Sequence, residues 1–254
     1  MRRTWAMLGY KAWHESRARF VLGAAVLGAV CVAFVVFQAE LRLMGATEAP
    51  ASTYGGYVYL RIYQSVGRAL FWLLAVVLGL GGLWRERAHD TIGFTLALPV
   101  HRAHHAVARA AVGLAEVFAL ALIPVAIVPA CSAMIGESYP LAQALGFALL
   151  WIAVGSAVFA VSFLVSVLVR SDYVALAVAV LTMRLVPGAL AKLPGLASVD
   201  VHSVMTGRGM AYFDPRRAQL IAAPWLAALA TVSVALALLA LAIRIASRQR
   251  LLEP

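Results

Sequence analysis

Long apolar stretches alternate with short polar ones along the 254 residues of this chain. A helix that spans a bilayer needs about 20 apolar residues, and this pattern predicts six spans in one all-α membrane domain covering residues 1–254. The fourth span is the most uniformly apolar, the second includes Arg61 and Arg68, and the third contains Pro124. The sixth follows Asp214-Pro215, a pair that favours helix initiation. The predicted spans are 20–37, 58–83, 107–135, 141–169, 173–186 and 220–246.

The composition agrees with a membrane protein. Hydrophobic residues make up 63% of the chain and charged residues 13%, whereas soluble domains are about half apolar and a quarter charged. The net charge of +10 could indicate nucleic-acid binding, but the charges lie at the ends of apolar runs. That placement is typical of topology signals and of contacts with anionic headgroups. We therefore expect membrane lipids as partners and no nucleic acid.

Lysine and arginine are concentrated in the N-terminal segment, in the loop 84–106 with Arg109, and in the C-terminal tail. By the positive-inside rule these segments are cytoplasmic, so we predict that both termini face the cytoplasm. The segment 187–219 is then an extracytoplasmic loop. We expect an uncleaved, multi-pass protein of the inner (cytoplasmic) membrane. Four tyrosines near the outer start of the second span predict an interfacial aromatic belt: Tyr54, Tyr57, Tyr59 and Tyr63.

Residues 1–19 have the pattern of an amphipathic helix. Trp5, Leu8 and Trp13 fall on the apolar side at 100° per residue, whereas Lys11 and Arg17 fall largely opposite. A helix with tryptophans on one side and bases on the other is suited to lie in the membrane interface. The alternative is a basic topology flank without a helix of its own.

The loop 84–106 contains the apolar run TIGFTLAL between charged residues. Asp90 and Thr91 can cap a short helix, and Pro99 discourages its continuation. The apolar side chains of this helix need a cover, which is either a protein partner or the chain's own bundle and the lipid headgroups. These side chains are Ile92, Phe94, Leu96 and Leu98.

Among the charged residues inside the predicted spans, we single out three: Glu116, Arg184 and Arg68. Charges at such depth are costly and are commonly found along transport pathways or in pairs. Glu116 and Arg184 either line a polar path or form pairs that fix the packing of the helices. Arg184, if its span breaks at Pro187, and Arg68 can instead extend toward the interface. His101 and His105 have a spacing that can bind zinc, but no HExxH motif accompanies them, so we expect headgroup contacts and no metal site.

The chain resembles the permease subunits of ABC-2-type transporters. The resemblance rests on Tyr10-Lys11-Ala12-Trp13-His14-Glu15-Ser16-Arg17 before the first span and on two stretches of the loop, Glu86-Arg87-Ala88-His89-Asp90-Thr91 and Leu96-Ala97-Leu98-Pro99-Val100-His101-Arg102. The family usually has glycine where this chain has Asp90. Six spans, cytoplasmic termini and a long outer loop between the fifth and sixth spans are similar as well.

The resemblance implies a non-catalytic transport subunit of an ATP-driven exporter. Residues 1–19 would be the elbow helix, and 84–106 would be the coupling loop whose short helix docks on a separate ATPase. Two ATPase copies would bind ATP and magnesium, and a second permease subunit, identical or related, would complete the translocation path. The chain has no GxxxxGK[ST] motif of its own. The implied docking residues are Glu86, Asp90, Thr91, Ile92, Phe94, Leu96, Leu98 and Pro99, and those of the interfacial helix are Trp5, Leu8, Trp13 and Arg17.

Two other classes of function stay open. An intramembrane enzyme needs a nucleophile with a partner on facing spans, but Ser156 lacks the GxSxG context and no histidine falls within a span. A secondary transporter is expected to show inverted repeats with matched helix breaks, and Pro124 and Pro187 interrupt two spans without an evident repeat. The transported substrate does not follow from the sequence.

Overall fold

The computed structural model describes residues 2–43, 53–80, 102–169, 201–207, 212–215, 217–222 and 225–248, with the single positions 174, 177 and 180. Within this part of the chain, five helical segments are long and apolar enough to cross a membrane. Their length and composition make the chain a multi-pass, all-α membrane protein. Apart from those single positions, the predicted fifth span, 173–186, lies outside the described residues, as does the part 84–101 of the predicted loop 84–106.

The first helix, α1, is one uninterrupted α-helix from Arg2 to Val36. The sequence predicts an interfacial helix over 1–19 and a separate span from residue 20, but the structure joins the two. Residues 10–22 contain no proline or glycine that would break the helix. At 1.5 Å per residue, 35 residues extend for about 52 Å, which exceeds the roughly 30 Å hydrocarbon core of a bilayer. A short helix, α2 (Gln38–Leu43), follows.

The second membrane-length segment has three parts: α3 (Tyr54–Val58), the π-helix η1 (Tyr59–Ser65) and α4 (Val66–Gly79). It begins four residues before the predicted boundary at 58, because Thr53 caps it by accepting a hydrogen bond from the Gly56 amide at 3.2 Å. The π-helix was not predicted. Gly67 permits it, since a Cβ there would lie 2.6 Å from the Ile62 carbonyl oxygen.

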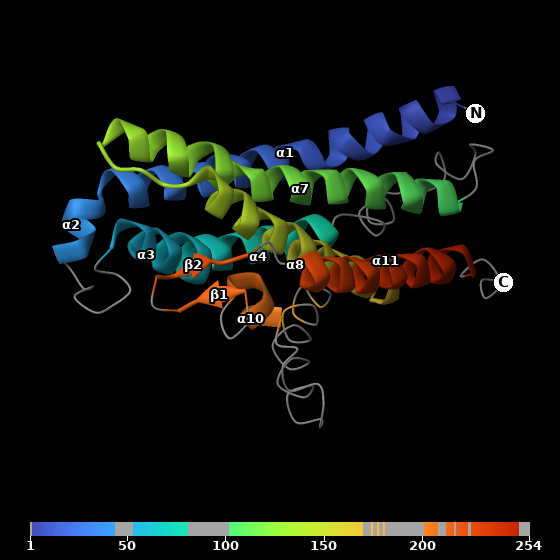
Figure 1. Ribbon diagram of the computed structural model, residues 1–254. Helices are drawn as coiled ribbons and strands as arrows, with labels where there is room; N and C mark the ends of the chain where they lie inside the picture. The colour runs from blue at the N-terminus through green and yellow to red at the C-terminus, as the bar shows by residue number, and fades with distance from the viewer. Residues whose placement is uncertain are drawn as a thin grey trace.

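The next two helices agree closely with the predicted third and fourth spans. Helix α7 runs from Arg102 to Met134 and includes Pro124 and Pro129. Helix α8 runs from Leu141 to Leu168 and is buried along most of its length. Figure 1 shows α1 and α7 side by side, with α8 and α4 beneath them. Helix α11 packs against α8. Helix α8 is therefore the centre of the bundle.

Close helix packing on α8 depends on glycines. A Cβ at Gly79 of α4 would lie 2.7 Å from the Phe159 carbonyl oxygen and 2.6 Å from the Ser162 Cβ. A Cβ at Gly155 of α8 would lie 2.7 Å from Phe71 of α4. Small residues that let helix backbones approach closely are characteristic of membrane bundles.

The last described helix, α11, extends from Trp225 to Arg248, and a small folded segment precedes it. This segment contains α10 (Val201–Thr206) and a two-stranded antiparallel hairpin, β1 (Phe213–Asp214) and β2 (Gln219–Leu220). Asp214-Pro215 therefore begins the hairpin turn and does not start the sixth span, whose helix begins later than the predicted residue 220. Asp214 accepts a hydrogen bond from the Arg217 amide instead, as turn aspartates commonly do.

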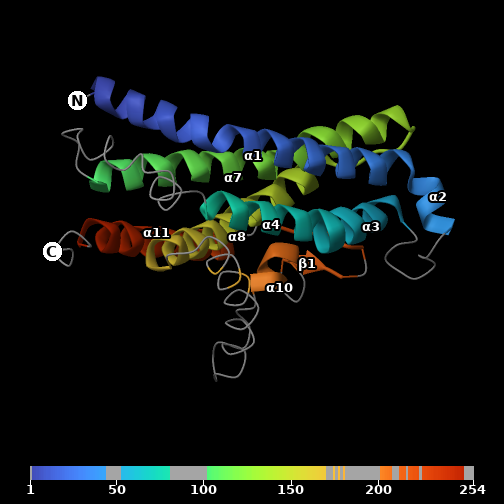
Figure 2. The same cartoon turned by 180° about the vertical axis from the view of Figure 1, so that it is seen from behind.

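Helix α1 begins and α11 ends at the same end of the bundle (Figures 1 and 2). This arrangement agrees with both termini lying on one side of a membrane. That the side is cytoplasmic, and that the spans number six, stay predictions.

Candidate functional site

The predicted docking residues Glu86, Asp90, Thr91, Ile92, Phe94, Leu96, Leu98 and Pro99 lie outside the described residues, as do Arg184 and His101. The structure does describe the helices on either side of this loop. Helix α4 ends at Gly79, and α7 begins at Arg102. The contacts of α7 with its neighbours therefore form the described part of the candidate site.

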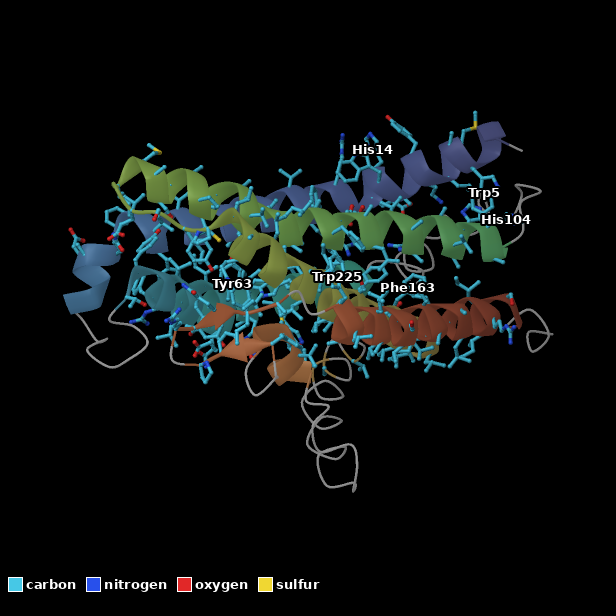
Figure 3. The ribbon with its side chains drawn as sticks, in the orientation of Figure 1. Trp5, His14, Tyr63, His104, Phe163 and Trp225 are labelled. Carbon is cyan, nitrogen blue, oxygen red and sulfur yellow. The ribbon has the colours of Figure 1, made fainter. Side chains whose placement is uncertain are left out.

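The first turns of α7 pack along the N-terminal half of α1. The rings of Trp5 and His104 lie 5.0 Å apart, centroid to centroid (Figure 3). Further along, the Arg109 guanidinium lies 3.6 Å from the Glu15 carboxylate, which also lies 3.8 Å from the Lys11 ammonium. Contacts advance along both helices together, so α1 and α7 are parallel over this region.

The four residues predicted for the interfacial helix do not share one environment. Leu8 is buried in the bundle and Trp5 lies against His104, whereas Trp13 and Arg17 are exposed. Trp13 packs only against Phe20 of its own helix among the ring contacts described. Part of the predicted apolar face therefore contacts α7, because two parallel helices bury the residues that face each other.

Glu116 is the buried acid of this helix pair. Only 3% of its surface is exposed, and its Oε1 accepts a hydrogen bond from the Ser16 hydroxyl of α1. Its Oε2 is buried without a hydrogen-bond partner in the described part of the chain. The positive charges of Arg109 and Arg19 act on the carboxyl. We name these residues, Glu15, Ser16, Arg19, Arg109 and Glu116, the α1–α7 polar seam.

Of the predicted intramembrane charges, the structure places Glu116 in this seam and Arg68 elsewhere, on α4. A pairing of Glu116 with Arg184 stays a prediction. The partner found for Glu116 is Ser16, which the sequence did not single out for that role. Ser16 and Glu116 are 100 residues apart in the sequence, so no local sequence pattern indicates their contact.

The four tyrosines predicted as an interfacial belt are buried instead. Tyr54, Tyr57, Tyr59 and Tyr63 are all 9% exposed or less. The Tyr63 ring stacks on Phe147 at 4.4 Å and meets the edge of Trp151 at 5.6 Å (Figure 3 labels Tyr63). The belt prediction is wrong because these tyrosines face neighbouring helices: Tyr59 and Tyr63 pack on aromatic residues of α8, whereas the hydroxyls of Tyr54 and Tyr57 bond to α7 and α1.

The segment before α11 is fixed to η1 and α8 by hydrogen bonds and ring contacts. Gln143 of α8 both donates to the Leu220 carbonyl and accepts from its amide, each at 2.8 Å. The Tyr59 hydroxyl donates to the Thr206 carbonyl at 3.1 Å, and its ring lies 5.0 Å from Phe213. The predicted outer loop 187–219 and the start of the predicted sixth span therefore contribute to a structured cap (201–207, 212–215 and 217–222) that rests on η1 and α8.

No metal centre is evident in the residues that the structure covers, where no three histidine, cysteine or acidic side chains gather. His104 contacts Trp5. The structure thus adds nothing that favours zinc over the headgroup contacts expected for these histidines.

No family model matches the chain, and neither a curated protein nor a solved structure matches it.

Proposed function

We propose that the chain is the membrane-spanning subunit of an ATP-driven ABC exporter. The observation that carries the proposal is the segment TIGFTLALPVHR between charged residues, which resembles the coupling helix of ABC-2 permeases. Its apolar side chains would dock on a separate ATPase, which would bind ATP and magnesium. Two ATPase copies and a second permease subunit, identical or related, would complete the transporter in the inner membrane.

The α1–α7 polar seam supports a path for mechanical coupling. Helix α7 begins three residues after Pro99, the predicted end of the docking helix. Its first turns contact α1 through the Trp5–His104 stack and the Arg109–Glu15 ion pair. A force applied to the loop 84–106 would therefore move α7 and α1 together. Rocking of this pair against the second subunit would alternately open the path to each side of the membrane.

Co-purification tests the proposal most directly. The chain, extracted in mild detergent without crosslinker, should bring with it a polypeptide that carries a GxxxxGK[ST] phosphate loop. If the chain is folded but no such ATPase accompanies it, the proposal is wrong. A secondary transporter or an intramembrane enzyme would then be the better interpretation.

A paired substitution tests the docking segment itself. Phe94→Asp with Leu96→Asp should abolish assembly with the ATPase while membrane insertion and yield are retained, because two charges would be buried in an apolar contact. Ile221→Asp is the matched control, since Ile221 is 71% exposed and belongs to the cap at the other end of the bundle. If the parent chain, the doubly substituted variant and Ile221→Asp all assemble equally well with the ATPase, then 84–106 is not the docking element.

A further inference from the structure

The two cysteines of the chain lie near the same end of the bundle, on the neighbouring helices α1 and α7. Cys31 is five residues before Val36, the last residue of α1, and Cys131 is three residues before Met134, the last residue of α7. At 1.5 Å per residue, both lie within about 8 Å of the end of their helix. Both are free thiols.

Helices α1 and α7 are parallel and keep one register. Figures 1 and 2 both show them alongside each other. Three contacts join residues that are 99 or 100 positions apart in the sequence: Trp5 with His104, Ser16 with Glu116, and Gly28 with Ile127. Cys31 and Cys131 are also 100 positions apart. The register therefore places the two cysteines opposite each other.

The helical period puts both cysteines on the facing sides of their helices. Gly28 faces α7, because a Cβ there would lie 3.2 Å from Cδ1 of Ile127. Cys31 follows Gly28 by three residues and Cys131 follows Ile127 by four, and residues at these spacings lie on one face of a helix. The two thiols also interact electrostatically. Register, helix face and this interaction all indicate that the thiols are neighbours.

The two thiols differ in access. Cys31 is fully buried, whereas Cys131 is partly exposed. A reagent can therefore reach Cys131 first, and Cys31 can react only with a group already bound beside it. With the predicted orientation, this end of the bundle is extracytoplasmic, the side of a membrane on which disulfides form and persist.

We infer that Cys31 and Cys131 are an oxidisable pair that forms a disulfide between α1 and α7. The oxidant is itself a disulfide, R–S–S–R. The Cys131 thiolate attacks one of its sulfurs, which breaks the S–S bond, forms a mixed disulfide and releases RS⁻. The Cys31 thiolate then attacks the Cys131 sulfur, forms the Cys31–Cys131 bond and releases the second RS⁻. The two RS⁻ take up the protons that the cysteines lose, so the oxidant gains two electrons and becomes two thiols.

The disulfide would join α1 to α7 beyond the α1–α7 polar seam, toward the opposite end of the bundle. The pair of helices would then be held by Ser16 and Glu116 at one level and by a covalent bond at the other. The bond also closes a loop of about 100 residues, which restricts the unfolded chain. The inference does not depend on an ATPase partner.

Reaction of the purified full-length chain with dithiodipyridine, in a neutral detergent, tests the inference. This small disulfide releases one thiopyridone, which absorbs light, for each of its sulfurs that is displaced. The parent chain should release two thiopyridones and keep no pyridylthio adduct, and its intact mass should fall by two hydrogen atoms. The chain denatured in SDS serves as the measure of all reactive thiols.

Single substitutions separate the two steps. Cys31→Ser should release one thiopyridone and keep one pyridylthio adduct on Cys131, because the second thiol is missing. Cys131→Ser should react at least about tenfold more slowly than the parent chain, because Cys31 is buried. Each variant should release one thiopyridone in SDS, and circular dichroism compares its helix content with that of the parent chain.

A parent chain that keeps a pyridylthio adduct, as Cys31→Ser does, would overturn the inference. So would a disulfide between two copies of the chain, seen as a dimer on a non-reducing gel. A folded parent chain that does not react, although the SDS-denatured chain releases two thiopyridones, would overturn it as well. Because these measurements use the chain alone, their failure leaves the proposed ATPase partnership untouched.

Discussion

The Ser16–Glu116 contact should be a main stabilising link between α1 and α7. Replacing Ser16 by alanine removes the donor to Glu116 Oε1 and leaves a buried carboxyl whose Oε2 already has no hydrogen-bond partner among the described residues. Loss of a hydrogen bond to a charged group costs about 1.5–3 kcal/mol. We therefore expect Ser16→Ala to lower the free energy of unfolding by roughly 2 kcal/mol.

Equilibrium unfolding in mixed micelles, followed by circular dichroism, measures this effect. Ser233→Ala is the matched control. In the described part of the chain, the Ser233 hydroxyl donates to the Leu229 carbonyl one turn earlier in α11, at 2.8 Å, and Ser233 is exposed. This control should change the unfolding free energy by less than about 0.5 kcal/mol.

A double-mutant cycle isolates the contact from other effects of each substitution. Ser16→Ala and Glu116→Gln are combined, and the two should be less destabilising together than the sum of their separate effects, by about 1 kcal/mol or more. Strictly additive effects, or a Ser16→Ala variant as stable as Ser233→Ala, would refute the reasoning that this hydrogen bond joins the two helices.

Three further substitutions test other parts of the fold. Gly79→Leu should lower the yield of folded protein by forcing α4 away from α8. Gly9→Leu is the control and should be tolerated, because a Cβ at Gly9 would meet nothing within 4 Å. Size-exclusion chromatography compares the yields of the two folded variants. Gln143→Leu removes both hydrogen bonds to Leu220 and should increase proteolysis of the cap by about tenfold, an effect that an unchanged cleavage rate would exclude. Gly67→Ala should disturb η1 through contact with the Ile62 carbonyl oxygen and reduce thermal stability; a variant as stable as the parent chain would show that the π-helix tolerates a side chain there.

The spans could be predicted because hydrophobic length is a local property. Helices α7 and α8 lie within a few residues of the predicted 107–135 and 141–169. Boundaries set by a single contact were harder to predict. The start at Tyr54 depends on the Thr53 cap, and the later start of α11 depends on a hairpin that the pattern of apolar residues does not indicate.

The environment of a side chain in a membrane bundle depends on which helix lies opposite, and periodicity carries no such information. The same four tyrosines would form an interfacial belt if they faced lipid, but here they face α1, α7 and α8. The N-terminal helix shows the same effect, since Leu8 is buried in the bundle and Trp13 is exposed.

The α1–α7 polar seam carries both signs of charge, with Glu15 and Glu116 beside Arg109 and Arg19. Such a seam can hold two helices together without an added molecule. Under the proposed function, it would let α1 and α7 move as one unit when the loop 84–106 is displaced.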